Sequence, residues 1–208
     1  MGRKSRNKGG RFERRIKEVL SDYWGVEAMR TPGSGAMKTT SSFNTFQGDV
    51  VLADGSGFPF VVECKNQEAW DYHNIILGNS TISSYWEQVV EDSLRSEYLD
   101  PILIFTKNYA SEFVILPYKK EIEELYTELQ GLVVTTIINI VNRSNGEPER
   151  YKVIMTDLET FTDIDKKEYM KNYGSDNWNW REETKVSKDK ILIPKETILD
   201  NMDKYIKR

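Results

Sequence analysis

The segment from Gly48 to Lys65, GDVVLADGSGFPFVVECK, carries the clearest structural pattern of the chain. Residues 49–53 are apolar after an initial aspartate and predict a strand. The tetrapeptide at 54–57 is rich in glycine and is typical of a hairpin connection, and residues 58–65 predict the antiparallel partner. The sequence therefore predicts a β-hairpin with acidic residues at its open end.

Three side chains of this hairpin could serve phosphodiester hydrolysis. Asp49 begins one strand and Glu63 lies near the end of the other, so their carboxylates can meet. Because side chains alternate along a strand, Glu63 and Lys65 share a face. Two carboxylates and a backbone carbonyl can hold Mg²⁺, and an adjacent lysine can stabilise developing charge or help activate water. The alternative for an isolated Glu-x-Lys is a surface ion pair.

The flanking sequence predicts a mixed sheet with helices on its faces. Apolar residues recur at helical spacing on both sides of the hairpin, and two β-rich segments follow. We expect a helix over 10–23 after a Gly9-Gly10 break, a long loop over 31–47, a helix over 82–94, and strands over 102–106 and 113–116.

The second half gives weaker patterns. We expect a helix over 122–129, strands over 132–141 and 151–156, an ordered loop or partner surface over 163–190, and a short strand and terminal helix over 191–208. Trp178 and Trp180, with Arg181, could stack on unpaired bases or fill a hydrophobic patch.

Composition excludes several classes of protein. The 208 residues are 38% hydrophobic and 30% charged, as in ordinary globular proteins. No apolar run reaches the length of a membrane span and no secretory signal begins the chain, so we expect a cytoplasmic protein without a membrane partner. Cys64 is the single cysteine, and we expect it to be buried. His73 is the single histidine, so the chain has too few histidines for a mechanism based on several of them.

Basic residues crowd the N-terminus although the net charge is −4. Such clustering favours contact with DNA phosphates, and a solvated tail is the alternative. The expected DNA-binding residues are Arg3, Lys4, Arg6, Lys8, Arg11, Arg14, Arg15 and, beyond them, Arg30.

The hairpin motif resembles the PD-(D/E)XK nucleases, with Gly48 where the motif name has proline. The resemblance implies an α/β, restriction-endonuclease-like fold, Mg²⁺ or a substituting Mn²⁺ bound by Asp49, Glu63 and the carbonyl of Cys64, and a catalytic role for Lys65. It spans residues 1–118, the expected nuclease core. Residues 119–208 would form an α+β extension packed on that core.

Two further segments resemble archaeal Holliday-junction resolvases, namely residues 8–14 and 30–36. That resemblance implies that Glu13 joins the metal site and that Ser34 contributes to catalysis. Glu13 could instead pair with Lys17, Ser34 could be a turn residue, and Arg30 could contact phosphate or only end a strand. Related exonucleases carry a Gln-x-x-x-Tyr element. Here Gln88 is present, but Asp92 stands where that element has tyrosine, so the element is incomplete.

The leading hypothesis is a structure-selective endonuclease that resolves four-way DNA junctions by paired nicks, acting as a homodimer on branched DNA. Small phage-encoded resolvases fit such a chain, which would place it in the host cytoplasm. One alternative is a restriction-type or replication and repair nuclease of the same fold, acting on duplex, flap or single-stranded DNA. Another is a DNA-binding factor without catalysis.

Overall fold

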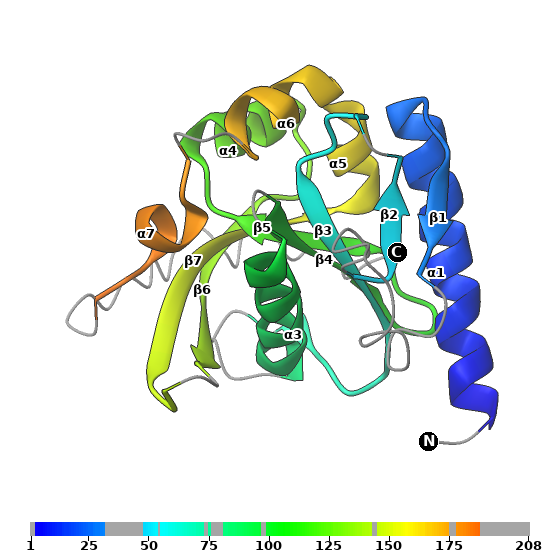
Figure 1. Cartoon of the computed structure of the whole chain (residues 1–208), viewed down its shortest axis with the longest axis horizontal. Coiled ribbons are helices and arrows are strands. Elements are labelled where there is room, and N and C mark those ends of the chain that lie inside the picture. The colour runs from blue at the N-terminus through cyan, green and yellow to red at the C-terminus, as the bar shows by residue number, and fades with distance from the viewer. Residues whose placement is uncertain are drawn as a thin grey trace.

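A computed structural model of the chain describes residues 3–31, 48–53, 55–72, 75, 81–96, 99–142, 145–174 and 178–187, with residues 3–7 as backbone only. Helices are interspersed among groups of strands along the chain (Figure 1). Their bounds are α1 Arg3–Trp24, β1 Ala28–Arg30, β2 Val50–Leu52, β3 Phe60–Asn66, α3 Thr81–Arg95, β4 Asp100–Thr106, β5 Phe113–Pro117, α4 Lys120–Glu128, β6 Val134–Val141, β7 Pro148–Asp157, α5 Leu158–Asp163, α6 Lys166–Asn172 and α7 Trp180–Thr184.

The strands form one mixed sheet of seven strands in the order β1-β2-β3-β4-β5-β7-β6. β3 and β4 run parallel, with Lys65 opposite Phe105, and the other neighbouring pairs are antiparallel. β7 joins β5 on one side and β6 on the other, so residues beyond 118 continue the sheet. The predicted α/β class is confirmed, as are the β2–β3 hairpin, α3, β4 and β5. The division into a core and an extension at residue 118 stays a prediction.

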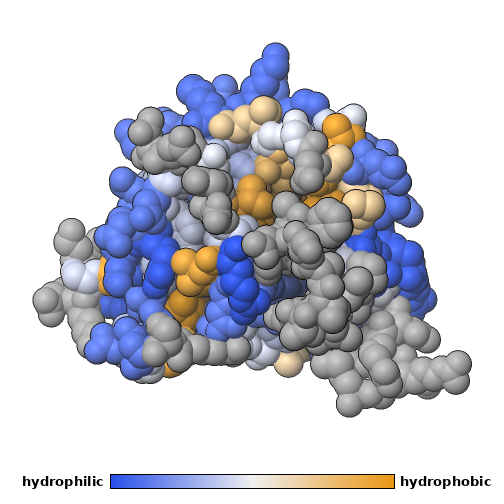
Figure 2. Space-filling view, viewed as in Figure 1, coloured by the Kyte–Doolittle hydropathy of each residue, from blue (hydrophilic) through white to orange (hydrophobic). Residues whose placement is uncertain are grey.

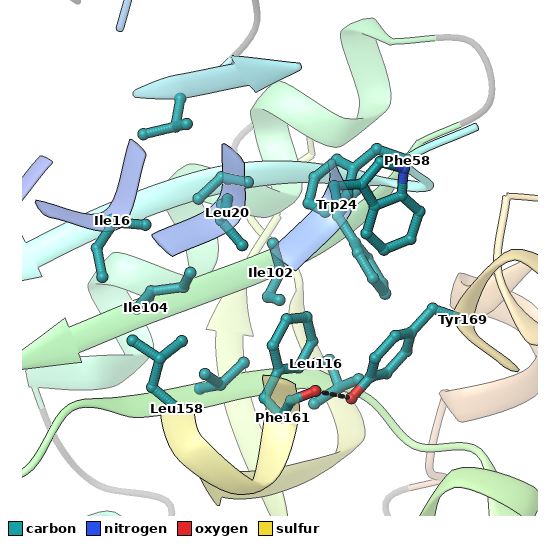
Figure 3. Close-up of a cluster of buried hydrophobic side chains, with 14 of the residues drawn as sticks. Ile16, Leu20, Trp24, Phe58, Ile102, Ile104, Leu116, Leu158, Phe161 and Tyr169 are labelled. Carbon is teal, nitrogen blue, oxygen red and sulfur yellow. Dashed lines mark hydrogen bonds between the residues drawn. The ribbon is translucent and has the colours of Figure 1, made fainter. Parts of the chain in front are cut away.

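One face of the sheet is covered by α1, α4, α5 and α6 (Figure 1). Ile16 and Leu20 of α1 are fully buried against the sheet, and Trp24 donates a hydrogen bond from Nε1 to the carbonyl of Ser56 (2.9 Å). Figure 3 shows the Tyr169 hydroxyl donating to the carbonyl of Phe161 (2.9 Å) in the same cluster. This core fixes α1 beside the hairpin.

The opposite face is covered by α3 and α7, and α3 lies in front of the sheet in Figure 1. Ile82, Trp86, Val89 and Val90 are the buried apolar residues of α3, at the helical spacing that the sequence predicted. They pack against residues of β3, β4 and β5 that point to this face. α3 therefore covers the face on which Glu63 and Lys65 lie.

The expected helix start near residue 10 is wrong. α1 begins at Arg3 and passes through Gly9 and Gly10 without a break. Each glycine costs a helix roughly 1 kcal/mol relative to alanine. Buried Phe12, Ile16, Leu20 and Trp24 offset that cost by anchoring the helix to the core.

The expected loop over 163–190 is also wrong in its described part, which contains α6 and α7. Each of these helices has a capping side chain, because Asp165 accepts from the Lys167 N–H (3.0 Å) and Asn179 from the Arg181 N–H (3.2 Å). Trp180 is buried against Tyr151, with ring centroids 5.1 Å apart, so it fills a hydrophobic patch and is not available to DNA bases.

Two predictions fall on segments outside the described residues, namely the loop over 32–47 and the strand and helix over 191–208. His73 also lies outside the described residues. Among the helices that are described, none has the length and apolar character needed to cross a membrane.

Candidate active site

The β2–β3 hairpin fixes the position of Asp49. Gly48 precedes it with φ 82°, which proline cannot adopt, and this explains the departure from the motif name. The Asp49 N–H donates to the carbonyl of Val62 (2.7 Å), and its Oδ2 accepts from the Cys64 N–H (2.9 Å). Asp49 is only 6% exposed. β3 therefore holds Asp49 through two hydrogen bonds, one to its backbone N–H and one to its carboxylate.

Glu63 and Lys65 lie on the face of β3 that α3 covers, while Cys64 packs into the opposite core, as predicted. The Lys65 Nζ donates to Glu63 Oε1 and to Gln88 Oε1 of α3, the latter at 3.0 Å. Glu63 is 1% exposed. The two carboxylates and the lysine thus meet at the carboxyl end of β3, where the hairpin register predicted them.

The electrostatics of this cluster are unusual for carboxylates. Burial raises the pKa of Glu63 well above its usual range, and the nearby Asp49 charge raises it further. Burial likewise raises the pKa of Asp49. Burial alone would lower the pKa of Lys65, but the Glu63 carboxylate outweighs it and the net shift is upward. A bound cation would favour the ionised carboxylates that burial disfavours.

Glu13 of α1 lies at the rim of this cluster. Its Oε2 accepts from Nε (3.0 Å) and Nη2 of Arg30 at the end of β1. The Glu13 charge raises the pKa of Asp49, which places it within electrostatic reach of that carboxylate. Arg30 therefore engages a carboxylate from the predicted site.

The other predicted residues lie along α1 or outside the described residues. Ser34 lies outside the described residues, as do the side chains of Arg3, Lys4 and Arg6. Lys8 pairs with Glu68 (2.5 Å) and Arg15 with Glu112 (2.5 and 2.9 Å). Arg11 and Arg14 are exposed on the same helix.

Two polar residues of α3 were not predicted as part of the site. Gln88 accepts the Lys65 hydrogen bond, and Asp92 is buried and paired with Arg95 (2.7 Å). The Asp92 charge raises the pKa of both Asp49 and Glu63. Gln88 and Asp92 are four residues apart and therefore lie on one face of α3. This spacing is the sequence signal that could have identified them.

Comparison with known proteins fits this arrangement. Residues 4–171 match the model of a family described as phage putative PDDEXK endonuclease. The chain belongs to this family. It is also similar to Protein D14 of Escherichia phage T5, with 30% identity over 118 residues that cover 54% of this chain and 70% of that protein. No solved structure matches the chain.

Membership of this PDDEXK family supports a nuclease that acts on DNA, and PDDEXK nucleases typically use divalent metals. The match runs past residue 118, where the predicted resemblance ended, into α6. The narrower assignment to junction resolvases stays a prediction.

The donor set suits a hard divalent cation. Among the described residues, no three side chains of the carboxylate, imidazole or thiol type converge on one point. Mg²⁺ does not require such a cage, because it usually keeps several waters and binds through one or two carboxylates. Asp49, Glu63 and the Cys64 carbonyl would provide that smaller set at the end of β3.

Proposed function

We propose that this protein is a Mg²⁺-dependent endodeoxyribonuclease whose active site is built from Asp49, Glu63 and Lys65. One observation carries the proposal: two nearly inaccessible carboxylates and a lysine meet at the end of β3 in a chain of a PDDEXK family. A surface ion pair would leave both carboxylates in water and would not need the Cys64 N–H to orient Asp49.

In this mechanism, Asp49, Glu63 and the Cys64 carbonyl would hold the metal, and Mn²⁺ would substitute for Mg²⁺. When bound, the cation supplies Lewis-acid stabilisation of phosphate charge and lowers the pKa of water. The Cys64 N–H keeps Asp49 Oδ2 in place. Gln88 fixes the Lys65 ammonium beside Glu63, where it can stabilise charge on the scissile phosphate. Glu13 and Ser34 are proposed to complete the site from the rim.

DNA would approach along α1. Arg11 and Arg14 are exposed, and hydrophilic side chains line the edge of the molecule where α1 lies (Figure 2). Arg3, Lys4, Arg6, Lys8 and Arg15 are the other proposed phosphate contacts of this helix. Such contacts carry little base preference and should weaken steeply with salt.

Within this class, we propose a four-way junction as the substrate, cut by paired nicks. The arrangement of Glu13 beside Arg30 and the two resolvase-like segments support this choice. A homodimer would match the two-fold symmetry of the junction and give one active site per nick. A restriction-type or replication and repair nuclease of the same fold is the second candidate, supported by the family match alone.

The experiment that tests this proposal compares cleavage of labelled four-way junction, its component duplexes, a flap and a single strand, with Mg²⁺ or EDTA. Paired, symmetric cuts in the junction that depend on Mg²⁺ are expected. Preferred cleavage of duplex, flap or single strand would move the function to the second candidate. No cleavage of any DNA would leave a binding factor as the remaining reading.

A further inference from the structure

Tyr109 stands out on the turn within the connection between β4 and β5, which spans residues 107–112. Its relative exposure of 108% means that the ring contacts almost nothing, and its φ of 60° lies in the left-handed region. A bulky side chain rarely adopts that conformation, and an aromatic ring in water buries no apolar surface. Neither feature stabilises the free protein, which favours a role in binding.

The turn is held in place by groups on neighbouring segments. The Asn108 N–H donates to Glu68 Oε1 (3.1 Å), and Lys107 Nζ donates to the Trp70 carbonyl (3.1 Å) while lying 4.6 Å from the centre of the Trp70 ring. The Thr106 hydroxyl donates to the Ser111 carbonyl (3.1 Å) of the same connection. A backbone that is fixed before binding loses little conformational entropy on binding, so only the Tyr109 side chain has to be ordered.

The turn also lies at the active end of the sheet. Lys65 is opposite Phe105 of the parallel strand β4, and Tyr109 follows four residues later. At ~3.3 Å per residue and ~4.8 Å between strands, its Cα lies at most about 14 Å from that of Lys65, or about four base steps. Arg15 of α1 bonds Glu112 beside this turn, so the proposed DNA-binding helix adjoins it (Figure 1).

We propose that the Tyr109 ring stacks on an unpaired nucleobase of the substrate, within about four base steps of the cleavage point. This inference rests on the proposed nuclease function. Stacking by Tyr109 would let the nuclease recognise DNA whose bases are not fully stacked. Aromatic stacking tolerates any base, as a structure-selective enzyme requires. The neighbours of Tyr109 along the chain are polar Asn108 and small Ala110, and among the described residues no other exposed large hydrophobic side chain belongs to this connection, which fits the face of a base better than a protein surface.

The test measures binding and stacking with the full-length protein. A four-way junction carrying 2-aminopurine at the branch would be titrated, with Ca²⁺ replacing Mg²⁺ to limit cleavage. Tyr109→Ala should raise the Kd for the junction about 5- to 150-fold, should change duplex binding less than about twofold, and should abolish the fluorescence quench. Tyr109→Phe should retain junction binding and quenching.

Two controls separate this role from a structural one. Tyr109→Gly relieves the left-handed backbone, so its Tm should equal or exceed that of the wild type while junction binding is lost. Asn108→Ala changes an exposed side chain on the same turn and should behave as wild type.

Each remaining outcome overturns the stacking role. Wild-type junction binding and cleavage by Tyr109→Ala would contradict the stacking while leaving the proposed function intact. A lower sedimentation mass for Tyr109→Ala, with duplex and junction affinity falling equally, would assign the ring to contact with a second copy. Failure of the wild type to bind or cut any DNA would contradict both the stacking and the proposed nuclease function.

Discussion

Replacing Gly48 by alanine tests how strongly the backbone positions Asp49. Gly48 has φ 82°, and an added Cβ would lie 2.4 Å from the carbonyl oxygen of Val62 and 3.1 Å from Val61 Cγ1. The clash is with backbone, which cannot rotate away. The same Val62 carbonyl accepts the Asp49 N–H at 2.7 Å, so relief of the clash must disturb that bond.

The expected cost follows from two contributions. A non-glycine residue in the left-handed region costs about 1–2 kcal/mol. Weakening the buried hydrogen bond from the Asp49 N–H to the Val62 carbonyl adds about 1 kcal/mol to this cost, and a shift of β3 away from the new methyl group raises the cost further. Gly48→Ala should therefore destabilise the protein by about 2–4 kcal/mol. Because Asp49 moves with the backbone, DNA cleavage should fall about 100-fold, the usual effect of a misplacement near 1 Å.

Gly55→Ala is the matched control. Gly55 has φ 80°, nearly the same as Gly48, but apart from its chain neighbours no atom of the described residues would lie within 4 Å of an added Cβ. Gly55→Ala should lower the free energy of unfolding only by the cost of a left-handed non-glycine residue, about 1–2 kcal/mol, and should keep wild-type activity. Urea unfolding followed by tryptophan fluorescence gives both stabilities, and a fixed-time DNA cleavage assay gives both activities. Equal stability and equal activity of the two variants would refute the argument that close backbone contact positions Asp49.

Three other perturbations follow from the structure. Lys65→Met should lower the cleavage rate about 10²–10⁴-fold with DNA affinity within about threefold, measured by single-turnover kinetics, and an unchanged rate would remove Lys65 from the mechanism. Burial raises the pKa of Asp100 to about 7. Stability should therefore fall as pH rises from 4 to 7, because the folded state keeps a proton that the unfolded state releases. Asp100→Asn should flatten that pH dependence in thermal melts. At pH 8 it should raise the free energy of unfolding by on the order of 2–4 kcal/mol, because an amide oxygen can still accept from Trp178 Nε1. A variant that melts in parallel with wild type at every pH would exclude this account. Trp24→Ala removes a side chain that is 2% exposed and should cost about 3–5 kcal/mol in urea unfolding, and a loss below about 1 kcal/mol would contradict its place in the core.

Local pattern predicted the elements that carry the candidate site. The period of two in β3 placed Glu63 and Lys65 together, and the hairpin connection brought Asp49 to them. The apolar spacing of α3 predicted which of its faces is buried. These features depend on residues close in sequence, for which periodicity is informative.

The features that sequence did not predict depend on distant contacts. The position of β7 between β5 and β6 follows from pairing across the chain, and β1 is too short to show a period. Glu13 has Lys17 as a local partner in the sequence, yet it pairs with Arg30, which lies seventeen positions away and becomes a neighbour only when β1 packs beside α1. The φ of Gly48 likewise depends on the approach of β3.

Single-turnover cleavage of a labelled four-way junction by wild type, Asp49→Asn and Gly55→Ala across a Mg²⁺ titration tests whether Asp49 belongs to a metal-dependent active site. Wild type and Gly55→Ala should cut only when Mg²⁺ is present, and Asp49→Asn should cut at least about 100-fold more slowly at every Mg²⁺ concentration. Cleavage by wild type in EDTA, or a wild-type rate for Asp49→Asn, would contradict this assignment of Asp49.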